Sequence, residues 1–482
     1  MLSLSRPDLL LSEAYLNGEW QGRAARFAVC NPSTGEVLAQ VSDCSAEDAK
    51  AAIAAAQTAQ KDWAKRTGKE RAAVLRKWFD LTVAHADDLA AILTAEMGKP
   101  LAEARGEIIY GASFIEWFAE EAKRVYGDTI PGHQRDKRIM VMKQPVGVVG
   151  AITPWNFPNA MITRKAGPAL AAGCAMVVRP ASETPLSALA IAKLGEEAGV
   201  PAGVFSVLPS TDSQGIGREF CENPAMRKIS FTGSTRVGSI LMRQGAEQIK
   251  KLSLELGGNA PFIVFDDADL DAAVEGAMLS KFRNAGQTCV CTNRIYVQDA
   301  VYDTFVGKLS AAVAALPVGD GFAEGTAIGP LISAAAVAKL RDHIADAEAK
   351  GGKVVTGGAE HERGGTFFQP TVIAGATGEM AVAREETFGP LAAVFRFSEV
   401  EEVLAAANDT EFGLASYFYS RDLSRIYQVM EGLEYGMVGV NTGLISTEAA
   451  PFGGIKQSGL GREGSKYGIE DYLELKYCCL SV

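Results

Sequence analysis

The sequence predicts an α/β protein whose main element is a doubly wound parallel sheet. The first observation is that short apolar strands alternate with helical segments from Gly147 to about Leu256, as in consecutive β-α-β units. The second is that the same alternation resumes after Pro261, which predicts a second α/β domain. The third is the length of 482 residues, which is enough for several domains of ~100–200 residues each.

The composition is that of a folded protein, because 48% of the residues are hydrophobic and 22% are charged. The 58 Asp and Glu residues outnumber the 47 Lys and Arg residues, and the formal net charge is −11. An acidic chain without a basic block argues against a nucleic acid partner. Eight cysteines are too few for a disulfide scaffold and predict reduced thiols in a cytoplasmic protein. No membrane contact is expected, because the longest apolar stretch, 166–178, is interrupted by glycine and proline and is shorter than a ~20-residue span.

The region 45–125 is predicted to be helical. Ser45 is a good N-cap residue for the Ala-rich segment that follows it. The segment 71–97 keeps apolar residues near helical spacing until a glycine and a proline end it, and a further periodic run covers 101–126. Polar and apolar residues alternate over 137–143 instead, which predicts a half-buried strand.

Strands and helices alternate from residue 147 onward. Apolar, β-branched strands joined by helices are typical of a parallel sheet, and nucleotides bind at the carboxyl ends of the strands in such sheets. The predicted strands are 148–152, 175–178, 204–207, 228–231 and 252–256, and the predicted helices are 159–172, 183–198, 213–220 and 235–244. The second domain is predicted to open with a strand over 262–265, a helix over 270–283 and a strand over 294–297.

Two glycine-rich segments have the spacing of phosphate-binding loops. Gly459–Gly464 matches G-x-G-x-x-G, but no apolar strand precedes it, so we interpret it as a turn. Gly233–Gly238 lacks the Lys-Ser/Thr of a triphosphate loop. It follows a predicted strand and opens a helix, however, so its backbone N–H groups can face a pyrophosphate. The four histidines are scattered without ligand spacing, so we expect neither a metal site nor a Ser-His triad.

Cys289 lies in a polar, glycine-containing loop directly after a predicted helix. A thiol in such a loop is accessible to a substrate, whereas structural thiols such as Cys174 lie within apolar runs. From the loop alone, Cys289 is equally compatible with a catalytic nucleophile and with an ordinary packed thiol.

Two segments at the ends of predicted strands favour the nucleophile. Two prolines in Thr153–Pro158 flank Asn156, and a fixed amide donor of this kind is worth ~10²–10³ in rate when it holds an oxyanion. Glu255 ends another strand in apolar company, and burial raises the pKa of a Glu toward the range of a general base. From its local sequence, Glu255 also fits an ordinary charge at a strand end.

The chain resembles the aldehyde dehydrogenase superfamily along nearly its whole length, from Asn17-Gly18-Glu19-Trp20 to the segment 451–459. The motifs that carry the resemblance are Thr153–Pro158, Phe231–Ser234, Glu255–Gly258, Gly286–Cys289 and Glu386–Pro390. The resemblance implies an NAD(P)-binding domain with a doubly wound parallel sheet, an α/β catalytic domain and a small β element for oligomerisation, and hence a homodimer or homotetramer. The implied bounds are 1–125 and 145–256 for the cofactor domain, 257–456 for the catalytic domain, and 126–144 with 457–482 for the bridging element.

The resemblance also implies a role for each matching residue. Cys289 corresponds to the nucleophile that attacks an aldehyde, Asn156 to the side chain that holds the oxyanion, and Glu255 to the base that activates the deacylating water. The residues that correspond to cofactor contacts are Thr153, Trp155, Arg179, Ser182, Gly233, Ser234, Glu386 and Phe388.

The implied cofactor is NADP, with NAD as the alternative. The family usually has Lys where this chain has Arg179, and relatives that prefer NAD often carry Glu at the position of Ser182. A carboxylate there would repel a 2′-phosphate, whereas Ser182 would not, and an arginine pairs with phosphate directionally. NAD stays open because Glu183 is adjacent.

The implied substrate is a small anionic aldehyde. Arg164, Arg283 and Ser446 match the pattern with which some family members grip the carboxylate of succinate semialdehyde, which they oxidise to succinate in 4-aminobutyrate degradation. Each arginine, taken alone, also fits a cation on a helix surface. Glutarate semialdehyde is the alternative substrate, because a pocket distinguishes one methylene by only ~1–3 kcal/mol. A cysteine acyltransferase or hydrolase and a non-catalytic structural family member remain as other classes.

Cys291 follows Cys289 by two positions. A Cys-x-Cys disulfide closes a small, strained ring that is easily reduced. Our hypothesis is that Cys291 is the redox partner in a reversible oxidative inactivation of Cys289. The alternative is that Cys291 simply packs in the loop.

Overall fold

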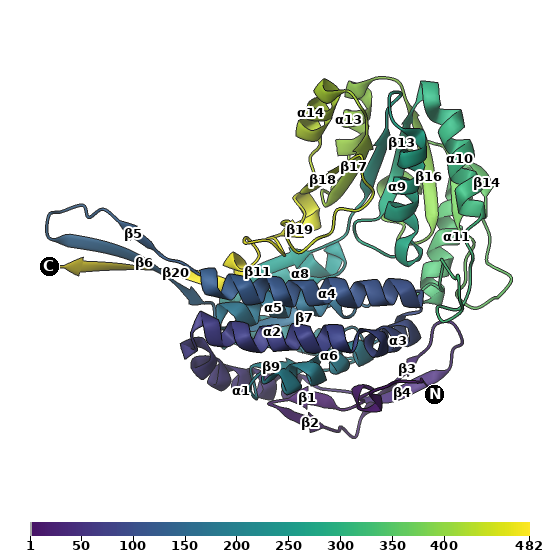
Figure 1. Cartoon of the computed structure of the whole chain (residues 1–482). Helices are drawn as coiled ribbons and strands as arrows, with labels where there is room; N and C mark the ends of the chain where they lie inside the picture. The colour runs from purple at the N-terminus through teal and green to yellow at the C-terminus, as the bar shows by residue number, and fades with distance from the viewer. Residues whose placement is uncertain (1) are drawn as a thin grey trace.

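The computed structural model describes residues 2–482, in which two α/β units lie against each other and a β arm projects from one side (Figure 1). The predicted α/β class is confirmed, because each unit is built on a largely parallel sheet covered by helices. A separate antiparallel hairpin is formed by β3 (Arg26–Cys30) and β4 (Val37–Ser42).

The first unit contains an eight-stranded sheet in the order β19-β11-β10-β7-β8-β9-β1-β2. From β7 the chain first continues outward through β8 and β9, and then returns to the other side of β7 with β10 and β11. The strand order therefore reverses between β7 and β10, which is where such sheets bind nucleotides. The parallel strands are β7 (Val148–Ile152), β8 (Ala175–Arg179), β9 (Phe205–Val207), β10 (Met226–Thr232) and β11 (Lys251–Glu255).

Three short strands at the two edges of this sheet run antiparallel to their neighbours. The sequence did not predict them. One of them lies in the segment that we predicted as part of the bridging element, and it pairs with β11. The three are β1 (Ala14–Leu16), β2 (Glu19–Gln21) and β19 (Gly459–Leu460).

Helices cover both faces of the eight-stranded sheet (Figure 1). Ser45 caps α1 as predicted, since its hydroxyl accepts the N–H of Asp48 at 3.3 Å. The periodic segment 71–97 is two helices rather than one, because His85 leaves the helical conformation and two aspartates open a new first turn after it. The helices are α1 (Ala46–Lys65), α2 (Gly68–Ala84), α3 (Ala86–Met97), α4 (Leu101–Glu121), α5 (Ala160–Ala172), α6 (Pro185–Ala198), α7 (Ser213–Glu222) and α8 (Thr235–Gly245).

The second unit contains a seven-stranded sheet in the order β14-β15-β16-β13-β12-β17-β18. Only β14 at one edge runs antiparallel to its neighbour. Its strands are β12 (Ala260–Val264), β13 (Thr292–Gln298), β14 (Lys353–Thr356), β15 (Thr371–Ala376), β16 (Leu391–Phe397), β17 (Ala415–Tyr419) and β18 (Met437–Val440). Its helices are α9 (Leu270–Phe282), α10 (Tyr302–Ala314), α11 (Ala334–Ala349), α12 (Ala381–Arg384), α13 (Val400–Asn408) and α14 (Leu423–Gly432).

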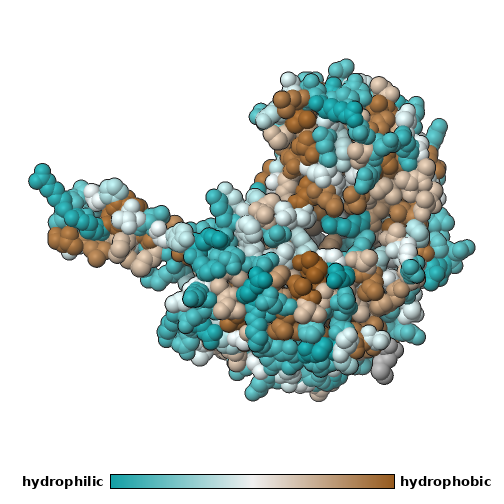
Figure 2. All heavy atoms as spheres, viewed as in Figure 1, coloured by the Kyte–Doolittle hydropathy of each residue, from teal (hydrophilic) through white to brown (hydrophobic). Residues whose placement is uncertain are grey.

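The projecting arm is a three-stranded antiparallel sheet in the order β20-β6-β5. Its strands are β5 (Asp128–Ile130), β6 (Lys137–Pro145) and β20 (Leu473–Ser481). Partly buried and exposed residues alternate along β6, as the alternation over 137–143 predicted. Hydrophobic side chains lie on the surface of the arm (Figure 2).

No helix among residues 2–482 is long and apolar enough to cross a membrane. All eight cysteines are free thiols. The predicted domain bounds stay a prediction.

Candidate active site

Cys289 is presented by a tight loop that follows α9. Asn284 and Ala285 both have a left-handed backbone with φ of 53°, and Gly286 continues it with φ of 72°. A Cβ on Gly286 would collide with the backbone carbonyl of Gly389. Glycine is therefore required for the thiol loop to pack against the loop that contains Gly389.

The thiol of Cys289 is partly buried. Burial raises its pKa to about 12, the charge of Arg164 opposes this rise, and the carboxylates of Glu386 and Glu255 add to it. The thiol is therefore protonated at neutral pH in the protein alone, and the reaction needs a group that takes its proton.

Asn156 lies in the loop after β7 and is 3% exposed. Its side-chain Nδ2 donates to the carbonyl of Gln287 at 3.0 Å, two residues before the thiol. Its own carbonyl accepts Nζ of Lys99 at 2.8 Å and Nδ2 of Asn284 at 3.1 Å. The amide is thus held next to the thiol loop by bonds at both its side chain and its backbone.

Glu255 ends β11 and is 3% exposed, which excludes the alternative of a solvated charge at a strand end. Its Oε2 has no hydrogen-bond partner among residues 2–482. Burial, followed by the negative charge of Glu463, raises the pKa of Glu255 well above its ordinary value. A buried carboxyl with a raised pKa and a free oxygen is suited to accept a proton from water.

Glu463 is a buried side chain that the sequence did not single out. It lies in the segment Gly459–Gly464, and its two oxygens lie 2.5 Å from Nζ of Lys165 and 2.6 Å from Nη2 of Arg164. Although burial alone would raise the pKa of Glu463, the charges of Lys165 and Arg164 hold it below its ordinary value. The interpretation of the glycine segment as a turn is wrong, because Gly459 and Leu460 form β19 against β11 and Glu463 forms an antiparallel bridge with Phe452. The segment also carries the anion of a buried charge cluster.

A cleft of about 670 Å³ opens where the strand order reverses between β7 and β10. Two polar atoms in it are buried without a partner among residues 2–482, namely Oγ1 of Thr153 and Nε of Arg179. At its other side Ser234 caps α8, whose first N–H groups favour an anion. These features fit an anionic dinucleotide. The predicted cofactor residues that line the cleft are Thr153, Trp155, Arg179, Ser182 and Gly233.

Two further arginines line this cleft and were not predicted. Arg218 on α7 and Arg236 on α8 are exposed. Neither forms an ion pair with any residue in the described part of the chain, 2–482. Arg236 lies within the predicted phosphate-binding segment Gly233–Gly238, which was the available signal.

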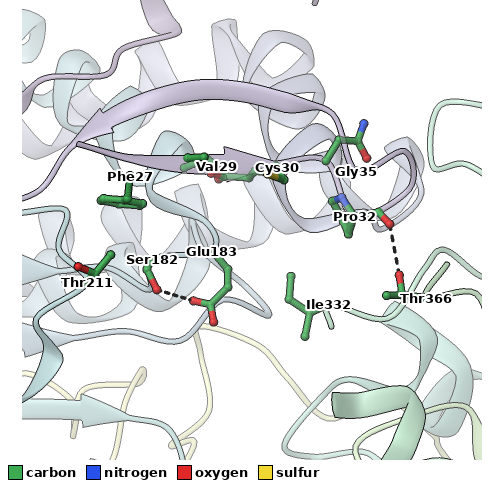
Figure 3. A pocket seen from close by; sticks show the side chains of 13 residues that line it. Phe27, Val29, Cys30, Pro32, Gly35, Ser182, Glu183, Thr211, Ile332 and Thr366 are labelled. Atoms are coloured by element: carbon green, nitrogen blue, oxygen red, sulfur yellow. Dashed lines mark hydrogen bonds between the residues drawn. The ribbon is translucent and has the colours of Figure 1, made fainter. Parts of the chain in front are cut away.

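Ser182 and Glu183 lie between the cofactor cleft and a second cavity of about 460 Å³. The hydroxyl of Ser182 donates to Oε2 of Glu183 at 3.1 Å (Figure 3). The carboxylate of Glu183 therefore lies beside the hydroxyl of Ser182, a residue that we predicted to contact the cofactor.

Glu386 and Phe388 lie in the second unit, in the segment between α12 and β16. Oε1 of Glu386 accepts the N–H of Gly258 at 3.1 Å, and burial raises the pKa of Glu386 to about 7. Phe388 has a left-handed φ of 55°. Its ring packs edge-on against Trp155, with centroids 5.6 Å apart and planes at 86°. Because Trp155 lines the cofactor cleft, this contact brings Phe388 next to the cleft.

The three residues predicted to bind the substrate have different surroundings. Arg164 is 1% exposed and stacks on Phe452 at 4.0 Å, so it is not a surface cation. Arg283 is partly buried, lies 5.5 Å from the ring of Phe157, and forms no ion pair within residues 2–482. Ser446 is partly buried in the loop after β18.

Tyr110 on α4 is a further candidate that the sequence analysis missed. Its hydroxyl is buried without a hydrogen-bond partner among residues 2–482. Burial raises its pKa, and the charges of Arg164 and Arg283 both oppose that rise. An unpaired donor near two arginines is suited to an anionic ligand, but its only sequence signal was an apolar helical face.

Cys291 is buried, and its thiol donates to the carbonyls of Lys281 at 3.2 Å and Thr292 at 3.6 Å. These contacts fit the alternative that it packs in the loop. Its pairing with Cys289 stays a prediction. No group of three or more His, Cys, Asp or Glu residues that would hold a metal ion occurs in the described chain, 2–482.

A model of the aldehyde dehydrogenase family matches residues 20–478. The chain belongs to this family. This aldehyde dehydrogenase is 63% identical over 484 residues to a protein of Escherichia coli strain K12 named as an NADP(+) succinate-semialdehyde dehydrogenase, with 100% of both chains covered. It is also 63% identical over 481 residues to a glutarate-semialdehyde dehydrogenase of Pseudomonas aeruginosa, with 99% of each covered.

A solved structure of a succinate-semialdehyde dehydrogenase from Burkholderia pseudomallei superposes with a TM-score of 0.99 at 62% identity, over 100% of both chains. The family resemblance and the aldehyde dehydrogenase fold that it implied are confirmed. The roles of the individual site residues stay predictions.

Proposed function

We propose that this aldehyde dehydrogenase oxidises succinate semialdehyde to succinate with NADP, as in 4-aminobutyrate degradation. The observation that carries the substrate class is Arg283. Its guanidinium comes from the loop that carries Cys289 and forms no ion pair among residues 2–482, although its charge acts on the partly buried carboxyl of Glu103. A cation without an ion-pair partner in the loop that carries the nucleophile suits an aldehyde with a carboxylate at its far end.

The Cys289 thiol first gives its proton to a water molecule, and its deprotonated sulfur then attacks the aldehyde carbon, whose carbonyl electron pair moves onto the oxygen. The side-chain amide of Asn156 and the backbone N–H of Cys289 hold the oxyanion of the adduct. When bound, the nicotinamide supplies the acceptor for the hydride that leaves this adduct, and a thioester on Cys289 remains. Glu255 then takes a proton from water, the resulting hydroxide attacks the thioester, and succinate leaves as the thiol is restored.

The cofactor preference is proposed from the cleft. Arg179, Arg218 and Arg236 give it three positive side chains, which favours a ligand with an additional phosphate. The carboxylate of Glu183 beside Ser182 opposes that phosphate, so we keep NAD as the second cofactor. The relative from Escherichia coli carries NADP(+) in its name.

Glutarate semialdehyde is the competing substrate, because a relative at equal identity bears that name. The two aldehydes differ by one methylene, which a pocket discriminates by only ~1–3 kcal/mol. Measuring kcat/KM for both aldehydes with each cofactor separates the candidates. A higher kcat/KM for succinate semialdehyde supports the proposal. A higher kcat/KM for glutarate semialdehyde would instead make that aldehyde the substrate.

A cysteine acyltransferase or hydrolase would have no use for the cofactor cleft or for the contact between Glu386 and Gly258. Nothing in the site favours this class over oxidation. A non-catalytic family member has no need of Cys289 and Glu255, and this chain keeps both.

We propose that the enzyme is a homodimer or homotetramer that uses the projecting arm as its interface. Strands β5 and β20 leave unpaired edges, and an exposed edge strand needs a partner or a cover. Large apolar side chains on the arm are exposed: Ile130, Met140, Met142, Leu475, Tyr477 and Leu480. Light scattering coupled to size exclusion gives the mass. A monomer at micromolar concentration contradicts this proposal.

We propose a cytoplasmic location, which is supported by eight free thiols in a chain of 482 residues. Oxidising compartments favour disulfides, whereas the cytosol keeps thiols reduced. Cell fractionation followed by immunodetection tests this, and recovery in the membrane or secreted fraction contradicts it.

A further inference from the structure

A buried ion pair lies behind Asn156, in a part of the first unit that the reaction does not touch. Lys99 follows α3 in the turn before α4, and its Nζ lies 2.6 Å from Oε2 of Glu107 on α4. The two side chains are 1% and 0% exposed. The same Nζ donates to the backbone carbonyl of Asn156 at 2.8 Å.

The second oxygen of Glu107 is also used. Oε1 accepts the N–H of Asn159 at 3.0 Å and the N–H of Ala160 at 3.2 Å. These groups open α5, and Asn159 makes no capping bond with its own side chain. Glu107 therefore acts as the cap of α5 from another helix. Between them, Lys99 and Glu107 hold both ends of the segment 156–160.

Two buried charges are costly unless they are paired and fully hydrogen-bonded. Here each member of the pair has a backbone partner in the Asn156 segment, and the ammonium of Lys99 also lies 3.8 Å from the ring centre of Phe157. A hydrophobic contact would stabilise the same packing without charges. What the pair adds is a fixed position for the peptide of Asn156, because charge-assisted bonds are short and directional.

We propose that Lys99 and Glu107 are positioning residues that hold Asn156 where its amide meets the oxyanion. This inference rests on the oxyanion role proposed for Asn156. Asn156 is gripped at its carbonyl by Lys99 and Asn284, while its side chain reaches Gln287 in the thiol loop. When the Lys99 contact is lost, the amide is free to shift, and a displacement of ~1 Å can lower a rate by ~10²-fold.

The test is a double-mutant cycle on the complete enzyme with succinate semialdehyde and NADP. Asn156→Ala is expected to lower kcat/KM for the aldehyde by ~10²–10³-fold, and Lys99→Met by ~10–100-fold with little change in KM for NADP. If Lys99 acts through Asn156, the double variant is no slower than Asn156→Ala alone. A merely structural role for Lys99 would instead multiply the two losses.

Lys228→Met is the matched control. Lys228 is equally buried, and its Nζ donates to Ser253 at 2.5 Å between β10 and β11, without contacting the Asn156 segment. Its effect on kcat/KM should be the same with and without Asn156→Ala. If Lys99→Met does not fold, Glu107→Gln repeats the cycle, because it removes the charge and keeps an oxygen for the N–H groups of α5.

If the double variant loses kcat/KM by the product of the two single losses, Lys99 or Glu107 does not act through Asn156. That result overturns the positioning role and leaves the oxyanion role of Asn156 intact. Unchanged activity in Asn156→Ala overturns the oxyanion role and this inference with it. The two failures are therefore distinguished by the single variant.

Discussion

The carboxylate of Glu463 lies 2.6 Å from Nη2 of Arg164, and both side chains are buried. Arg164 thus already has an anionic partner within the protein, which it shares with Lys165. Arg283 has no such partner in the described chain, 2–482. Two arginines that look equivalent in the sequence are therefore electrostatically different, and the substrate carboxylate is expected to depend most on Arg283.

Arg283→Gln should raise KM for succinate semialdehyde by ~10–100-fold, because it removes a charge-assisted bond worth ~1.5–3 kcal/mol. KM for a neutral aldehyde of similar length should change little. Arg164→Gln should lower kcat/KM for both aldehydes, because it leaves the buried charge of Glu463 with one partner fewer. Steady-state kinetics of the two variants with both aldehydes checks this. Equal losses for the anionic and neutral aldehyde in Arg283→Gln would refute the carboxylate contact.

Glu463→Gln should move the acidic limb of the kcat–pH profile to lower pH. Glu255 works as a base only when deprotonated, so the rate falls as the pH drops through its pKa. The negative charge of Glu463 raises that pKa, whereas Arg164, Lys165 and Arg462 lower it. Removing the charge of Glu463 therefore lowers the pKa of Glu255. The profile is measured from acid to neutral pH with Lys228→Met as the control, and a limb that stays in place or moves upward would contradict the coupling.

Ser182→Glu should reduce kcat/KM for NADP by ~100-fold or more and change that for NAD far less, because a carboxylate beside a 2′-phosphate costs several kcal/mol. Glu183→Gln should instead raise kcat/KM for NADP relative to NAD, since it removes the carboxylate that Ser182 contacts at 3.1 Å. Both cofactors are compared at saturating aldehyde. An unchanged ratio of NADP to NAD activity in both variants would show that Ser182 and Glu183 do not lie beside the 2′-phosphate.

Peroxide should inactivate the parent enzyme and dithiothreitol should restore it, if Cys291 forms a disulfide with Cys289. Cys291→Ala should then recover less activity than the parent, because a sulfenic acid on Cys289 without a thiol to condense with is oxidised by further peroxide to a sulfinic acid, which dithiothreitol does not reduce. Free thiols are counted alongside activity. Equal recovery of the parent and the variant would leave Cys291 as the packed thiol that its bonds to Lys281 and Thr292 describe.

The sequence predicted correctly those strands and helix ends that depend on residues close together in the chain. The strand before Asn156 was predicted as 148–152 and is Val148–Ile152, and Ser45 caps its helix through its own side chain. These features depend on burial and capping within a few residues. The break at His85 was missed, because both helices pack apolar side chains into one core and keep the periodicity across it.

The rest of the site depends on contacts that are remote in sequence. Glu463 meets Lys165 across 298 positions, and Lys99 meets Asn156 across 57. A glycine-rich motif and a helix-ending turn do not indicate a buried charge, because the partner that permits its burial is far away in the chain. Tyr110 was missed for the same reason, since its unpaired hydroxyl is visible only in three dimensions.

The most direct test follows the absorbance of reduced nicotinamide when the purified enzyme is given succinate semialdehyde with NADP and, separately, with NAD. We expect rapid reduction with NADP, a lower kcat/KM with NAD, and no reduction in Cys289→Ala. No reduction with either cofactor, or undiminished reduction in Cys289→Ala, would contradict the proposed reaction.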